Sequence, residues 1–225
     1  MKILAIDSSG LVASVAVIED DRLIGEYTID YKKTHSQTLL PMLDEVKEMI
    51  ELDLSTVDVV AVAAGPGSFT GLRIGSATAK GLAEALDLPI AEIPTMDARR
   101  NQVYSGFYSF EWKDGEENGF VFKIEKPQFA EDMHTVIREL NELGRPVMFL
   151  GDAVPIQKEA IRTELSVPFG FAPANCNRQH AGAVAVLALQ YAKEGRLVKA
   201  CEHKPEYLRL SQAERERMEK ENASR

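Results

Sequence analysis

Residues Val57–Arg73 read VDVVAVAAGPGSFTGLR, and this segment indicates the fold class. Val57–Ala64 is apolar at every position except Asp58, as in a strand that is covered on both faces. Gly65–Ser68 has turn composition, and the following residues favour a helix over Thr70–Leu86. A buried strand, a glycine-rich turn and a helix in this order indicate an α/β protein.

The flanking residues extend this unit on both sides. Three short apolar or alternating segments precede it and predict strands at Ile3–Ile6, Ala13–Ile18 and Leu23–Tyr31. Leu39, Leu43, Val46 and Ile50 have helical spacing, and Pro89–Ile93 predicts a fifth strand. Three meandering strands followed by helix, strand, helix and strand is the order of a ribonuclease-H-like core.

The second half repeats this scheme in shorter form. Strands are expected at Val103–Trp112 and Phe120–Ile124, and a helix from Met133 ends at Gly144. The fold class is therefore α/β with two ribonuclease-H-like lobes, the second reduced, which is the plan of the actin, sugar-kinase and Hsp70 superfamily. We expect a first lobe over residues 1–96, a second over 97–195, and a C-terminal extension over 196–225 that packs back or is partly frayed.

Composition limits the function classes. The 225 residues carry a formal net charge of -9, so the chain repels phosphate backbones at long range and is a poor candidate for binding nucleic acid alone. The longest apolar run, Ala181–Leu189, is far short of a membrane span. Two cysteines cannot form a disulfide framework. We therefore expect a cytoplasmic protein that has no membrane contact.

Two segments are candidates for holding a phosphate or a metal-bound nucleotide. Gly65, Gly67 and Ser68 precede a helix N-terminus, which is a natural anion site; the alternative is a tight turn in which Ser68 or Thr70 caps the helix. Asp7, Ser8 and Ser9 follow the first strand and have the chemistry to hold Mg²⁺ through water. A turn closed by the Asp7 side chain is the alternative.

The two helices of the first lobe are candidates for a protein interface. Small residues recur every four positions along the second helix, and the first helix has a second apolar side that includes Leu40 and Met49. Packing against the chain's own sheet is the alternative for the small residues. The predicted interface consists of His35, Leu39, Leu40, Leu43, Val46, Gly71, Arg73, Gly75, Ala79 and Ala83.

Catalytic and metal sites are not indicated. The four histidines lack metal-ligand spacing, and Cys201, Glu202 and His203 stand without a second cluster. No serine has a nucleophile-elbow signature. Arg99 and Arg100 lie in a polar turn, where contact with a partner or with RNA competes with simple solvation.

Several segments in this order resemble the TsaB (YeaZ) family. They include Ile3–Ser9, His35–Pro41, Gly65–Gly75, Asp97–Arg100 and Pro205–Arg209, so the resemblance covers nearly the whole chain. The family has a further stretch between the Pro-Thr that matches Pro94-Thr95 and the Asp-Ala-Arg-Arg, where this chain has only Met96.

The resemblance implies a non-catalytic subunit of the complex that adds threonylcarbamoyl to N6 of adenosine 37 in tRNAs that read ANN codons. Its implied partners are the catalytic TsaD subunit, the TsaE ATPase and a second copy of itself, with tRNA bound only through the complex. ATP and Mg²⁺ would be used by the partner subunits, so this chain would need no cofactor. TsaD uses a His-x-x-x-His helix, whereas this chain has no histidine between His35 and His134.

Two other functions compete with that interpretation. One is a small ATPase or kinase of the actin-like superfamily that uses Asp7 and the Gly65–Ser68 loop. The other is a protease, for which the sequence has neither metal ligands nor a nucleophile constellation.

Overall fold

The computed structural model describes residues 1–94, 102–114 and 119–205. The chain forms two compact units, Met1–Thr95 together with Arg178–Arg225, and Met96–Asn177. Arg99 and Arg100, singled out in the sequence, lie outside the described residues.

The first unit is built on a five-stranded sheet in the order β3-β2-β1-β4-β5. Its strands are β1 (Lys2–Asp7), β2 (Ala13–Glu19), β3 (Arg22–Ile29), β4 (Val59–Gly65) and β5 (Ile90–Pro94). β1 pairs antiparallel with β2 and parallel with β4, so that Ile3 lies between Ile18 and Val59. This is the predicted ribonuclease-H-like order, and the α/β fold class is confirmed.

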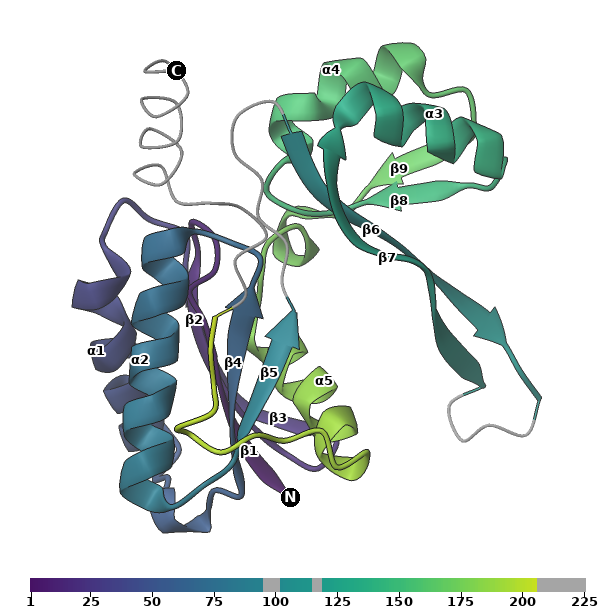
Figure 1. The fold of residues 1–225 in the computed structure, drawn as a ribbon. Helices are drawn as coiled ribbons and strands as arrows, with labels where there is room; N and C mark the ends of the chain where they lie inside the picture. Colours follow the sequence, from purple (N-terminus) through teal and green to yellow (C-terminus); the bar gives the residue numbers. More distant parts are fainter. Residues whose placement is uncertain (95–101, 115–118, 206–225) are drawn as a thin grey trace, which may run out of the picture. The chain divides into compact units, whose positions relative to one another are not determined.

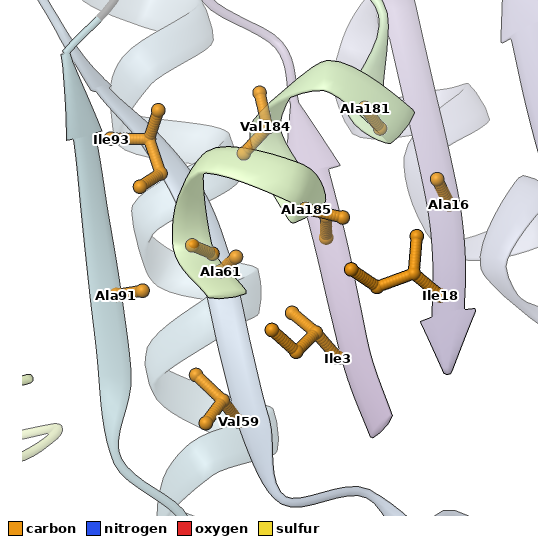
Figure 2. Close-up of a cluster of buried hydrophobic side chains, with 12 residues drawn as sticks. Ile3, Ala16, Ile18, Val59, Ala61, Ala91, Ile93, Ala181, Val184 and Ala185 are labelled. Carbon is orange, nitrogen blue, oxygen red and sulfur yellow. The ribbon is translucent and has the colours of Figure 1, made fainter. Parts of the chain in front are cut away.

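Helices cover both faces of this sheet (Figure 1). On one face lie α1 (His35–Met49) and α2 (Phe69–Leu86), which contact each other, and the short η1 (Leu54–Thr56) follows α1 in the chain. On the other lies α5 (Ala181–Lys193). Figure 2 shows Ile3, Ile18 and Val59 beneath α5. Alternate residues of β1 turn to the other face, where Leu4 and Ile6 pack under α1.

The predicted boundary of the second lobe at residue 195 is wrong, because α5 belongs to the first unit. Ala181, Ala185 and Ala188 are fully buried against the first sheet. Alanines let the helix approach the strands closely, and the sheet needs a cover on this face to keep its apolar side chains from water.

The second unit is smaller, as predicted. It contains a hairpin of β6 (Gln102–Trp112) and β7 (Phe120–Asp132), a parallel pair of β8 (Val147–Phe149) and β9 (Phe169–Phe171), and the helices α3 (Met133–Leu143), α4 (Val154–Glu164) and η2 (Ala174–Cys176). β7 extends eight residues beyond the strand predicted to end at Ile124. Strand β9 was not predicted. Within the described parts of both units, no helix combines the length and apolarity needed to cross a bilayer.

Candidate functional site

The first candidate residue, Asp7, is the last residue of β1 and is almost fully buried. Its Oδ1 accepts hydrogen bonds from the Ser9 backbone N–H at 2.9 Å and from the Ser9 hydroxyl at 2.7 Å. Burial raises the pKa of the Asp7 carboxyl, because an ion is poorly solvated there, and the two bonds from Ser9 oppose that rise. Asp7 therefore closes a local turn.

The glycine-rich turn packs directly on this loop. Ser68 donates its backbone N–H to the carbonyl oxygen of Ser9 at 2.6 Å, and the Ser68 hydroxyl caps α2 by accepting from the Gly71 N–H. A Cβ at Gly67 would lie 2.6 Å from the same Ser9 oxygen. Gly65 has φ +118, which a side chain would strain. The structure thus brings the six predicted residues together, with Ser8 donating its hydroxyl proton to the Gly71 carbonyl.

These residues do not fit a nucleotide phosphate as they are arranged. The Ser68 amide that would bind an anion is paired with Ser9, and Asp7 is buried and accepts two bonds from its own loop. Among the residues that the structure describes, no group of three His, Cys, Asp or Glu side chains could hold a metal ion.

The small residues of α2 do not form a surface track, and this part of the interface prediction is wrong. A Cβ at Gly71 would fall on the carbonyl oxygen of Ser8, and one at Gly75 would lie 2.5 Å from the Ser8 hydroxyl. Ala79 and Ala83 are buried in a cluster with Val60, Val62 and Ile90. The stripe faces the chain's own sheet, where a larger residue would push the helix away.

The predicted residues of α1 are divided in the same way. Leu39, Leu43 and Val46 are buried against the sheet, whereas Leu40 is 56% exposed. His35 is half-buried, and its Nε2 lies 3.0 Å from the Gly10 carbonyl oxygen. On α2, the exposed Arg73 places its guanidinium over the Phe69 ring.

The exposed surface of this helix pair includes small and apolar residues beside charged ones such as Glu48 and Glu84. Ala77, Gly81 and Ala85 of α2 are exposed and again four positions apart, so they lie along one side of that helix. Leu40 and Met49 of the neighbouring α1 are also exposed, but nine positions separate them, so they lie on opposite sides of α1. We call the exposed residues Ala77, Gly81, Ala85 and Leu40 the outer face. The sequence carries the same small-residue spacing for this side of α2, two positions out of phase with the predicted stripe.

Comparisons with known proteins agree with the fold. The tRNA threonylcarbamoyladenosine biosynthesis protein TsaB of Bacillus subtilis (strain 168) is 31% identical over 236 aligned residues, which cover 95% of this chain and 96% of the relative. The TsaB of Haemophilus influenzae is 39% identical over 100 residues, 44% of this chain and 41% of the relative.

A structure and a family model add to these relatives. The structure of YeaZ from Pseudomonas aeruginosa has a TM-score of 0.73 at 24% identity and covers 92% of this chain and 99% of that chain, which shows a shared fold. The family model for TsaD, a tRNA N6-adenosine threonylcarbamoyltransferase, matches residues 22–111. On the near full-length similarity to the Bacillus protein, this chain belongs to the TsaB family.

Proposed function

We propose that this protein takes part in tRNA threonylcarbamoyladenosine biosynthesis as a non-catalytic subunit that binds and activates the catalytic TsaD. The observation that carries the proposal is the similarity to TsaB over 95% of the chain. The arrangement around Asp7 supports the non-catalytic role, because the loop and turn that hold phosphates in actin-like ATPases are hydrogen-bonded to each other here.

The outer face is the proposed binding surface for TsaD. Its residues are apolar and those on α2 are small, so another helix could approach α2 closely. Exposed charged residues, among them Arg73 and Glu84, lie on the same helix. The TsaD family model spans α1 and α2. A catalytic homologue with a related helix pair could therefore occupy the place of a second copy of this chain. Self-association and TsaD binding would then compete for one surface.

The other partners follow from the same complex. TsaE would join through the assembly, ATP and Mg²⁺ would be used by the partner subunits, and tRNA would be held by the complex. With a formal net charge of -9, this chain supplies little attraction for tRNA by itself.

Reconstitution tests the proposal. Threonylcarbamoyl transfer to tRNA is measured with TsaD and TsaE, with and without this protein, and we expect product to require it. Leu40→Arg should abolish both TsaD binding and the stimulation, because it places a charge in the apolar outer face. Val186→Arg is the matched control, since Val186 is 60% exposed on α5, across the sheet. Equal product with and without the protein would refute the activating role.

Calorimetry separates the subunit from the competing small ATPase. The isolated protein titrated with ATP and Mg²⁺ should show no micromolar binding. Binding accompanied by hydrolysis would favour the ATPase instead.

A further inference from the structure

The segment Val198–Lys204 crosses from the end of α5 to the opposite side of β5. Val198 and Ile90 exchange two backbone hydrogen bonds, of 2.8 and 2.9 Å, so the segment pairs with the outer edge of the last strand in the sheet. Val198 and Ala200 then pack with Ala79 and Ala83 of α2. The segment therefore contacts both the sheet edge and the helix.

His203 fastens the end of this segment. Its side chain is fully buried, with Nδ1 2.6 Å from the Glu92 carboxylate on β5 and Nε2 2.9 Å from the Ser76 hydroxyl on α2. A carboxylate only accepts, so Nδ1 carries the hydrogen, and in the neutral ring Nε2 accepts from Ser76. Lys80 also donates from Nζ to the His203 carbonyl oxygen at 3.3 Å.

A serine, a histidine and a carboxylate hydrogen-bonded in this order also form the catalytic triad of many hydrolases. This group differs from a triad because its serine is not accessible to a substrate. Ser76 is 3% exposed and lies within α2, so a substrate carbonyl cannot reach its oxygen. A metal-binding role for His203 is excluded as well, because both ring nitrogens have protein partners.

We propose that Val198–Lys204 is a latch, fastened by His203, that holds the C-terminal half of α2 in its partner-binding position. The residues it holds, Ser76 and Lys80, precede Ala77 and Gly81 of the outer face by one position. Because His203 contacts Ser76 and Lys80, it restricts the movement of α2 and so fixes the position of the exposed Ala77 and Gly81. The link to a partner rests on the proposed function, whereas the latch itself is a property of the isolated chain.

Hydrogen exchange of the isolated protein tests the latch. In His203→Ala, the amides of Val198 and Ile90 and those of residues 76–86 should exchange about tenfold faster, because a buried hydrogen-bond pair is lost. Amides of β1 should stay unchanged. His203→Asn keeps a donor near Glu92 and should recover part of the protection. His134→Ala, in the second unit, is the control. Unchanged exchange in His203→Ala would overturn the latch.

Affinity for TsaD tests the link to the outer face. His203→Ala should bind TsaD about tenfold more weakly than the wild type, and His203→Asn should be intermediate. Faster exchange with unaltered affinity would show that the latch does not position the outer face. Failure of the proposed function is distinct, since the wild type itself would then neither bind TsaD nor stimulate the transfer. Labelling of Ser76 by a fluorophosphonate would overturn the purely structural role of this group.

Discussion

The hydroxyl of Ser8 donates to the carbonyl oxygen of Gly71 at 2.9 Å, across 63 residues of sequence. This contact joins the loop after β1 to the first turn of α2, and it requires the helix backbone to approach the loop without a side chain between them. Gly71 is a close-approach glycine, whereas Gly81, on the same helix, has no atom within 4 Å of the place where a Cβ would lie.

The two glycines should therefore respond oppositely to alanine. We expect Gly71→Ala to lower the free energy of unfolding by about 1–3 kcal/mol, because the new methyl group overlaps backbone at Ser8. Gly81→Ala should raise it by about 0.5–1 kcal/mol, since alanine is the better helix former at an exposed position. Urea unfolding measures both. Equal effects of the two variants would contradict the close packing of α2.

Asp7 provides a prediction in pH. Its pKa is raised in the folded protein by burial, so the folded state binds the proton more tightly than the unfolded state does. The free energy of unfolding should therefore fall as pH rises from the unfolded pKa, near 3.9, through the folded one. In Asp7→Asn this loss is removed, so the free energy of unfolding of the variant should vary less with pH and should exceed that of the wild type at pH 7.

Asp53 is a control for Asp7. It accepts from the Ser55 N–H at 2.9 Å and the Ser55 hydroxyl at 2.7 Å, the same geometry as Asp7 with Ser9, but it is exposed. Hydrogen bonds from Ser55 lower its pKa. Asp53→Asn should consequently have a lower free energy of unfolding than the wild type at pH 7, and this difference should shrink in acid. The effect is opposite in sign to that of Asp7→Asn. Urea unfolding of both variants at pH 4 and pH 7 decides whether burial controls Asp7.

Much of the first unit could be predicted from periodicity. Val59–Gly65 is buried at every residue, as its apolar run indicates, and the strand order follows from the element order. The turn that the Asp7 side chain closes with Ser9 is also predictable, because an Asx turn involves only three consecutive residues. The sequence offered it as the alternative to a Mg²⁺ site.

The orientation of α2 could not be predicted in the same way. A stripe of small residues permits close approach to any neighbour, and it does not say whether that neighbour is a sheet or another protein. Here the neighbour includes the Ser8 carbonyl, which comes from a distant loop. Likewise Glu92, a charge in the apolar strand β5, signals a buried partner, but His203 lies 111 residues further on. The placement of α5 depends on such long-range contacts too.

His134 gives a second titration. Its Nδ1 lies 2.7 Å from the Glu164 carboxylate, and that hydrogen bond raises the pKa of the imidazole above 6.5. The stabilisation from this pair should be fully present below pH 6.5 and lost as pH rises through the raised pKa. NMR titration of the His134 ring should show the raised pKa in the wild type and a value near 6.5 in Glu164→Gln. An identical pKa in both proteins would mean that the contact between His134 and Glu164 is absent in solution.

The last prediction separates the two small-residue stripes of α2. Gly81→Leu adds bulk to the outer face, where a Cβ would meet no atom from outside its own helix turn within 4 Å, so the monomer should stay folded and lose both self-association and TsaD binding. Ala79→Leu places the same bulk in the core with Val60, Val62 and Ile90, and should destabilise the monomer by about 1–3 kcal/mol. Sedimentation measures association and urea unfolding measures stability for each variant. A stable interface buries about 1,200–2,000 Å². A leucine at position 81 would keep the partner helix from packing closely on α2, so an interface of that size could not form. If Gly81→Leu still associates, the partner binds elsewhere, and if Ala79→Leu is as stable as the wild type, the stripe that contains it does not face the sheet.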